Sequence, residues 1–385
     1  MSIPEIYEID SFLKPYKEVL SKPQYVHFSH FVKSLPVCEI PSVQRFSALH
    51  TKSRSSLSRF LSESTWKIEQ MKQIYQSELK PYIPSDSFLL IDDTISKRPY
   101  AKKVERANYH YDHTSGKNVQ GYSIVTSVLR TEESIIPYDI QPYYRKEDCN
   151  DLPFKTKNQL AADIISSSKK FNRITTVIFD SWYSNDEVIC ACKQANKHYI
   201  TQIKSNRNVT INFKKRFVRE HAQMIKEKQW KEMKYNDGKI RFFYTSAFIS
   251  KIGSVHLIFS QMYNQKDKCW GETHYFISDL LEVSPQEILR MYLVRVGIES
   301  FHREAKQNIG LEGYFLRKCR GIERYLFLVM LTYSILALQG LSKKLSIGQA
   351  CQENKVLLFE QVYNEILQDP DKRWLIFHNL AKAGV

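Results

Sequence analysis

Short apolar runs in the middle of the chain have the pattern of buried strands, and their order limits the possible folds. Such runs lie at residues 88–94 (FLLIDDT), 122–129 (YSIVTSVL) and 134–140 (SIIPYDI). Helical and strand patterns then alternate up to the run YITQI, which ends at residue 203. Neighbouring strands followed by alternating helices and strands are typical of a mixed sheet with helices on both faces. We therefore predict an α/β fold.

Changes in periodicity divide the rest of the chain into further regions. The N-terminal part has helical spacing, whereas a later stretch alternates polar and apolar residues between turn signals and is typical of a β-rich insertion. The amphipathic pattern at the C-terminus predicts helices that pack on the core or on another subunit. The predicted regions are 1–80 (helical), 81–205 (core, first part), 206–276 (β-rich insertion), 277–345 (core, second part) and 346–385 (C-terminal helices).

The charge balance of the chain is strongly basic. Lys and Arg total 56 against 41 Asp and Glu, which gives a formal net charge of +15. This favours a polyanionic partner, most often nucleic acid, with an anionic membrane surface as the alternative. The N-terminus lacks the apolar core of a signal peptide, and the longest apolar run, residues 325–341, is shorter than the roughly 20 residues that span a bilayer. We predict a buried core helix there, a cytoplasmic protein and no membrane partner.

Two short helices near the N-terminus form a candidate DNA-binding motif. Ser42 and Ser53 can each cap a helix, with a turn at residues 50–52 between them. The apolar residues of the two helices are Phe46, Leu49, Leu57, Phe60 and Leu61. A plain helical hairpin is the alternative interpretation. The second helix exposes Arg54 and Arg59, which favours a helix-turn-helix that contacts DNA.

Acidic residues follow two of the predicted strands. Asp92 and Asp93 come directly after LLI, and Asp180 comes after VIF. Carboxylates at strand ends lie at the rim of a sheet, where they can converge without disturbing the core. Acids also end strands as turn formers or caps, so either interpretation is open.

The segment YLVRVGIESFHREAK, residues 292–306, predicts one helix that is nearly buried. At about 100° per residue its ionisable residues fall within an arc of roughly 80°; they are Tyr292, Arg295, Glu299, His302 and Lys306. Apolar residues surround this stripe, namely Leu293, Val294, Val296, Ile298 and Phe301. Unpaired charge in an interior is costly, so the stripe must meet polar partners. Arg295 and Glu299 can pair with each other, or the stripe can face a metal and a phosphate.

The spacing Tyr, two residues, Arg, three residues, Glu, six residues, Lys resembles the signature of bacterial insertion-sequence transposases of the DDE type. These proteins have an RNase H-like catalytic core. Tyr292, Arg295, Glu299 and Lys306 match all of its positions. The text around the acids, IDDT, VIFDSWYS and IESFHREAKQNIGLEGYFLR, is also similar to that family, and the β-rich insertion falls between the second and third acids as it does there. The resemblance covers residues 88 to about 340.

The resemblance implies that Asp93, Asp180 and Glu299 are catalytic and hold two Mg²⁺ ions, with Mn²⁺ as a substitute. Hard carboxylate oxygens suit these ions, and the chain has no Cys or His cluster for zinc. Two divalent ions held by carboxylates align the nucleophile and stabilise the leaving group of a phosphodiester. In that family the metal-binding acid directly precedes a threonine, which favours Asp93 over Asp92 as the metal ligand. Asp92, on the other face of the strand, is then structural.

The resemblance also implies DNA contacts. Tyr292, Arg295 and Lys306 grip phosphates near the scissile bond. Lys97, Arg98 and the cluster at residues 204–219 are further candidates for backbone contacts. In the family an aromatic residue of the insertion stacks on a flipped base, for which Trp270 is the candidate, with Trp230 behind it; an ordinary core role is the alternative for both.

These observations predict a transposase that binds the inverted repeats of its own element, cuts them and joins them to target DNA. Its partner is double-stranded DNA, it acts as a homodimer in a synaptic complex, and it is associated with the bacterial nucleoid. An RNase H-like nuclease without strand transfer would use the same acids. A third possibility, a DNA-binding protein that has lost catalysis, is disfavoured because all three acids and the signature are present.

Overall fold

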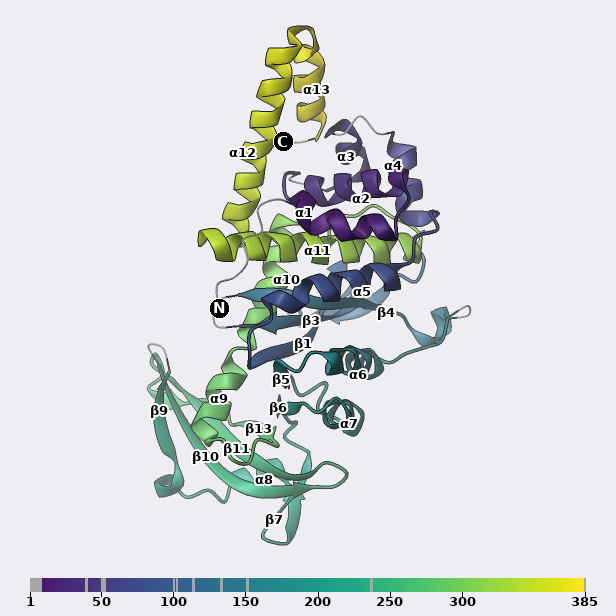
Figure 1. Ribbon diagram of the computed structural model, residues 1–385. Coiled ribbons are helices and arrows are strands. Elements are labelled where there is room, and N and C mark those ends of the chain that lie inside the picture. The colour runs from purple at the N-terminus through teal and green to yellow at the C-terminus, as the bar shows by residue number, and fades with distance from the viewer. Residues whose placement is uncertain are drawn as a thin grey trace. The chain divides into compact units, whose positions relative to one another are not determined.

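The computed structural model describes residues 9–38, 41–49, 53–99, 101, 103–112, 115–131, 134–149, 152–235 and 238–383. The chain forms two compact units that alternate along the sequence (Figure 1). The first unit consists of Met1–Pro84, Asp93–Phe154 and Ile298–Val385. The second unit consists of Ser85–Asp92 and Lys155–Gly297. The chain therefore passes between the units several times, twice within the predicted catalytic motifs.

The second unit is built on parallel strands. The first part of β1 (Ser87–Lys97) pairs in parallel with β5 (Ile174–Phe179), and β5 pairs in parallel with β6 (His198–Gln202). Helix α6 (Lys157–Ser167) leads into β5, α7 (Asp186–Gln194) connects β5 to β6, and the two helices pack against each other. Parallel strands need such crossovers, because a tight turn cannot return the chain to the same end of the sheet.

The β-rich insertion extends the sheet of the second unit. Strand β13 pairs antiparallel with both β6 and β11, and β11 pairs along its length with β10. The insertion strands are β7 (Asn208–Ile211), β8 (Lys214–Phe217), β9 (Lys231–Tyr235), β10 (Gly238–Ile249), β11 (Gly253–Asn264), β12 (Cys269–Trp270) and β13 (His274–Ser278), with a short helix α8 (Val218–Ala222). The strand-rich character predicted from alternation is confirmed, and the insertion is continuous with the core sheet.

In the first unit, the remaining part of β1 lies beside β3 (Lys117–Arg130). Strand β3 pairs antiparallel with β2 (Asn108–Asp112) near its start and with β4 (Ile135–Tyr143) over its second half. Together with the parallel strands β5 and β6 of the second unit, this pairing pattern is that of an RNase H-like fold. The predicted α/β class is confirmed.

Helices make up the rest of the first unit. They are α1 (Ile9–Leu13), α2 (Lys22–Ser34), α3 (Val43–Leu49), α4 (Arg54–Ser62), α5 (Ile68–Leu79), α10 (Val296–Asn308), α11 (Cys319–Lys343), α12 (Ile347–Gln368) and α13 (Arg373–Ala383). The predicted caps of α3 and α4 are confirmed, because the Oγ atoms of Ser42 and Ser53 accept from backbone N–H groups three residues on. Phe31 of α2 packs against Phe46 and Phe60. The predicted turn at 50–52 lies outside the described residues.

Helix α11 forms the centre of the first unit. It contacts β4, α2, α4, α5 and α12, and Figure 1 shows it between the N-terminal helices and α5. It is 25 residues long, so the helix extends beyond both ends of the apolar run at 325–341. Among the described residues it is the one helix long and apolar enough to cross a membrane, and 89% of its apolar window is buried. Its burial confirms the prediction of a core helix.

A buried arginine attaches α11 to the end of α4. Arg324 is 4% exposed, and its guanidinium donates to the carbonyl oxygens of Leu61 (2.9 Å), Ser64 (2.8 Å), Phe60 and Trp66. It also lies 4.1 Å from the centre of the Trp66 ring. Burial lowers the pKa of Arg324 to about 10, so the side chain stays charged at neutral pH. One side chain thereby satisfies carbonyls that the last turn of α4 leaves without helical partners.

We predict that Arg324→Met destabilises the first unit by about 3 kcal/mol, because buried carbonyl oxygens would lose their donor. Arg320→Met is the matched control, since Arg320 is exposed on the same helix; it should change stability by less than about 0.5 kcal/mol. Urea unfolding followed by circular dichroism measures both. Equal effects of the two substitutions would show that the contact with α4 is unimportant.

Candidate active site

The parallel pairing of β1 with β5 brings two acids together in the second unit. Ile91 pairs with Phe179, and the residues that follow them are Asp92 and Asp180. The pairing of β1 with β5 ends at Ile91 and Phe179, although β1 itself continues to Lys97, and this parallel register places the next residues, Asp92 and Asp180, side by side. Both side chains are half-buried.

Asp180 is held in place by its neighbours. Its carboxylate oxygen Oδ1 accepts from the backbone N–H of Trp182 at 2.9 Å, and its carbonyl oxygen accepts from the hydroxyl of Thr201 at 3.1 Å. The first contact is a local side-chain-to-backbone turn, which also explains why an acid can follow a strand. In this chain the turn fixes the orientation of the Asp180 carboxylate at the sheet edge.

Arg295 and Tyr292 lie beside the acids of the second unit. The Arg295 guanidinium is 2.7 Å from Oδ2 of Asp92, and about one fifth of each side chain is exposed. Burial raises the pKa of Tyr292 to about 12; the Arg295 guanidinium acts to lower it, and the Asp180 and Asp92 carboxylates raise it further. Tyr292 is therefore close to both carboxylates and stays protonated at neutral pH.

Asp93 belongs to the first unit, where its carboxylate accepts from the hydroxyl of Ser123 on β3 at 3.1 Å. Successive residues of a strand point to opposite faces, so Asp92 and Asp93 face different neighbours. The register within the second unit places Asp92 beside Asp180. The sequence favours Asp93 as the metal ligand, and that assignment stays a prediction.

The segment 292–306 is two helices and not the single helix that the periodicity predicted. Helix α9 (Pro285–Leu293) ends before Val294, and α10 begins at Val296. The N–H groups of Arg295 and Gly297 bond to carbonyls three residues back, at 3.0 and 2.9 Å. This tighter turn, together with the low helix propensity of Gly297, interrupts the helix.

The predicted stripe is consequently divided, and part of its surroundings is exposed. Tyr292 and Arg295 lie in the second unit, whereas Glu299, His302 and Lys306 lie in the first. Glu299 is exposed in the first turn of α10, and Val296, predicted to be covered, is 57% exposed. Ile298, Phe301 and Ala305 are buried, as an amphipathic α10 requires. The predicted burial therefore holds for one face of α10 only.

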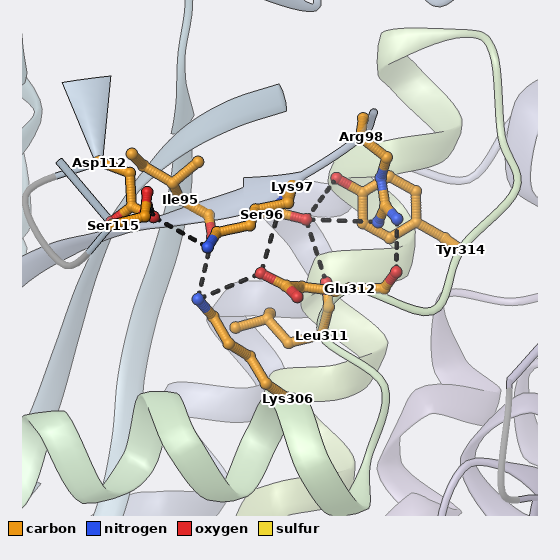
Figure 2. Close-up of polar contacts among 10 residues, drawn as sticks. All are labelled: Ile95, Ser96, Lys97, Arg98, Asp112, Ser115, Lys306, Leu311, Glu312 and Tyr314. Carbon is orange, nitrogen blue, oxygen red and sulfur yellow. Dashed lines mark hydrogen bonds and ion pairs between the residues drawn. The ribbon is translucent and has the colours of Figure 1, made fainter. Parts of the chain in front are cut away.

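Lys306 joins strand β1 to the segment after α10, as Figure 2 shows. Its Nζ donates to the carbonyl oxygen of Ile95 at 2.9 Å and lies 3.1 Å from Oε1 of Glu312. Glu312 in turn accepts from the backbone N–H of Lys97 at 3.3 Å. Glu312 was not predicted as a site residue from the sequence, although it lies within the quoted motif IESFHREAKQNIGLEGYFLR. Its position six residues after the signature residue Lys306 was the feature that could have indicated a pair.

Lys97 and Arg98, predicted to contact the DNA backbone, make contacts within the first unit. Lys97 Nζ is 2.8 Å from Asp112 Oδ2, and the hydrogen bond to that carboxylate raises the pKa of Lys97. The Arg98 guanidinium carbon lies 3.4 Å from the centre of the Tyr314 ring, and the group also donates to the carbonyl oxygen of Glu312 (Figure 2). Phosphate contacts of these residues stay predictions.

The remaining predicted DNA contacts differ in exposure. Arg54 and Arg59 of α4 are exposed, as expected for a recognition helix. Trp270 and Trp230 are half-buried, and the Arg241 guanidinium lies 4.7 Å from the first ring and 4.8 Å from the second. Trp270 therefore has a packing role in the insertion, while its stacking on a base stays a prediction.

The carboxylates fit a divalent cation by their chemistry, since hard oxygen donors are what such ions prefer. Within either unit taken alone, the described residues contain no group of three His, Cys, Asp or Glu side chains that could hold a metal. Asp92 and Asp180 belong to the second unit, and Asp93 and Glu299 to the first. In the second unit the Arg295 guanidinium supplies positive charge at Asp92, where a cation could take its place.

An RNase H-like sheet with Asp92 in β1 beside Asp180 at the end of the adjacent strand β5 defines the chain as a candidate DDE-type phosphoryl-transfer protein. A family model for the DDE superfamily endonucleases matches residues 41–224. The chain is also 22% identical over 334 residues to a probable transposase for insertion sequence element IS701 from Microchaete diplosiphon, an alignment that covers 83% of this chain and 84% of the relative. The chain is thus similar to DDE superfamily endonucleases and to an insertion-sequence transposase, as its motifs predicted. The family-model match ends before the signature helices.

We predict that Arg295→Met lowers the free energy of unfolding by about 2 kcal/mol, because the half-buried Asp92 would lose a charged hydrogen-bond donor. Arg290→Met on the same helix is the control: Arg290 is exposed and pairs with Glu287 at 3.3 Å, a contact worth less than about 1 kcal/mol. In the double variant Asp92→Asn, Arg295→Met the losses should not add. Strict additivity in urea unfolding would contradict the pairing.

Proposed function

We propose that the protein binds the ends of its insertion sequence and carries out metal-dependent DNA strand cleavage and strand transfer. The observation that carries the proposal is the register of β1 with β5, which sets Asp92 beside Asp180 in a chain of the DDE family. The net charge of +15 supports a polyanionic substrate, and the substrate we propose is double-stranded DNA. We place this activity in the bacterial cytoplasm.

Asp92, Asp180 and Glu299 are the residues that we propose to hold the metal, with Asp92 taking the role first given to Asp93. Two Mg²⁺ ions, or Mn²⁺ in their place, would activate the attacking oxygen and stabilise the leaving oxygen. The protein's own contribution is to orient carboxylates: the N–H of Trp182 fixes that of Asp180. Glu299 is exposed at the start of α10, where it can turn towards a ligand.

The basic residues of the signature would change partners when DNA binds. Arg295 bonds to Asp92, and Lys306 lies against Glu312 and the Ile95 carbonyl. Each can release an internal carboxylate and take a phosphate oxygen, an acceptor of the same charge and similar geometry. Such an exchange keeps the guanidinium and ammonium groups neutralised in both states.

The C-terminal helices are the proposed contact in a homodimer. Helix α12 exposes Leu357, Phe359, Tyr363 and Leu367, and Trp374 of α13 is 74% exposed. Exposed apolar side chains on adjoining helices favour association with another protein surface. A second copy is the partner that a synaptic complex with two DNA ends requires.

We predict that Asp92→Asn, Asp180→Asn and Glu299→Gln each reduce Mg²⁺-dependent cleavage of a DNA duplex carrying an element end by about a thousandfold or more. The reason is the loss of several kcal/mol of charge stabilisation in the transition state. Binding of the same duplex should remain within a fewfold of the unsubstituted protein. Cleavage is measured on gels with end-labelled DNA, and binding by mobility shift.

Asp93→Asn is the matched control for this assignment and should retain measurable cleavage. The opposite result, with Asp93→Asn inactive and Asp92→Asn active, would return the ligand role to Asp93. A pre-cut end with a free 3′-hydroxyl should also join plasmid DNA. Cleavage without joining would support a nuclease that lacks strand transfer.

The N-terminal motif generates a separate prediction. Deleting residues 1–80 would expose the core, because Arg324 and α11 pack on α4, so surface substitutions are the cleaner test. The double variant Arg54→Ala, Arg59→Ala should bind element ends at least tenfold more weakly, with unchanged binding to unrelated duplex after correction for charge. Lys22→Ala, Lys33→Ala on α2 is the control of equal charge. Equal losses in the two double variants would reject the recognition-helix assignment.

A further inference from the structure

A groove in the second unit lies beside Asp180 and has no part in the chemistry assigned so far. It has a volume of about 750 Å³, and its lining comes from the Asp180 loop, the start of α7 and strands β7 and β10. Trp182, Lys204, Arg207, Lys215 and Phe248 are among the lining residues. This volume is in the range of pockets that hold organic ligands the size of a nucleotide.

Exposed aromatic side chains mark the groove as a stacking surface. Trp182 is 55% exposed and Phe248 is 52% exposed, although both are large enough to be favoured in a core. Nearby, the β7–β8 hairpin turns through Asn212 and Phe213, both with positive φ, and leaves Phe213 fully exposed. Aromatic faces that solvent can reach are available to flat, unpaired rings.

Cationic side chains surround the same aromatic surface. The Nζ atoms of Lys204 and Lys157 lie 5.2 and 5.9 Å from the centre of the Trp182 ring. These distances are near the outer limit of about 6 Å for a cation–π contact, so the ammonium groups are held only weakly to the ring. Asp186 also lines the groove, and its negative charge is neutralised by the Arg207 guanidinium at 3.1 Å and the Lys251 ammonium at 3.5 Å from its carboxylate oxygens. The groove therefore suits a polyanion.

The groove also has polar atoms that lack a described hydrogen-bond partner. They are Oδ1 of Asn158, Oγ of Ser184 and Nδ2 of Asn185, all from residues that line the groove. Buried polar atoms without partners are uncommon in proteins and need an explanation such as a bound water or ligand.

We propose that this groove binds a single-stranded DNA segment, with an unpaired base stacked on Trp182 and phosphates at Lys204 and Lys215. Single strands are bound by grooves that combine positive charge with aromatic faces. A duplex would keep its bases stacked on one another and would leave the aromatic faces unused. The site is separate from Trp270, which packs against Tyr263 and Arg241 elsewhere in the insertion.

The position of the groove gives the bound strand a role in the proposed function, on which this part of the inference rests. Trp182 follows Asp180 by two residues, so their Cα atoms are at most about 7 Å apart. The N–H of Trp182 also donates to the Asp180 carboxylate, which couples the aromatic ring to the proposed metal ligand. The bound strand would then be the DNA strand that becomes unpaired next to the scissile phosphate.

The test measures binding of a labelled oligodeoxythymidine of about 12 nucleotides by fluorescence anisotropy, without metal, to the full chain. Trp182→Ala should weaken binding roughly fivefold to a hundredfold, the range for loss of one stacked base. Trp182→Phe should recover most of the affinity, because it keeps an aromatic face. Lys204→Ala should weaken binding and reduce the dependence on salt by about 0.7 in the log–log slope.

Phe248→Ala and Phe315→Ala form a matched pair, since both residues are exposed but Phe315 lies in the first unit. The former should weaken oligonucleotide binding and the latter should not. A duplex of equal length should compete poorly. Unchanged affinity in Trp182→Ala with a normal unfolding midpoint, or equal competition by the duplex, would overturn the proposal.

If the groove does not bind single-stranded DNA, the binding and cleavage measurements give one set of results. If the protein is not a transposase, they give a different set. Glu299→Gln should bind the oligonucleotide normally while losing cleavage of element ends, which supports both. If the unsubstituted protein did not cleave element ends, the transposase proposal would fail, and the oligonucleotide measurements would still decide whether the groove binds single strands. If Trp182→Ala kept both full cleavage and oligonucleotide binding, the groove alone would be rejected.

Discussion

A charged guanidinium inside an apolar core is the constraint around which the first unit is arranged. Arg324 is costly to bury, and its position is tolerable because carbonyl oxygens at the end of α4 surround it. Gly321, one turn earlier, allows this closeness, since a Cβ there would lie 2.9 Å from the Ser62 hydroxyl. The N-terminal helices are thereby fixed to the core helix, which would give the proposed DNA-recognition motif on α4 a rigid base.

The same physical rule, that a buried charge must find a partner, shapes the candidate active site. Arg295 meets Asp92, Lys306 meets Glu312, and the exposed Lys97 meets the buried Asp112. In each pair a basic residue predicted to touch DNA contacts an acid of the protein itself. Phosphate binding at these residues, as proposed, would compete with an internal acid, so affinity for DNA would depend on the difference between two similar interactions and would fall as salt rises.

The α/β class of the fold could be predicted from the sequence. The caps at Ser42 and Ser53 and the apolar core helix can be read locally, because each depends on residues within a few positions, whereas β1 continues past the acids Asp92 and Asp93 to Lys97. Other features needed coordinates. The choice between Asp92 and Asp93 depends on the register with β5, which is set by pairing across more than eighty residues. The break at Val294 follows from a tight turn that a helical wheel cannot represent, and the groove at Trp182 joins segments far apart in the chain.

The points at which the chain passes between the two units have a consequence for how the catalytic groups are connected. One crossing is the peptide bond between Asp92 and Asp93, and another follows Gly297, two residues before Glu299. Asp92 and Asp93, which belong to different units, are thus joined by one peptide bond, and Glu299 of the first unit lies four residues after Arg295 of the second. Whatever arrangement the units adopt, the backbone itself sets an upper limit on the separation of Arg295 and Glu299 of about 14 Å between Cα atoms. Loops elsewhere can lengthen in evolution without loosening this connection.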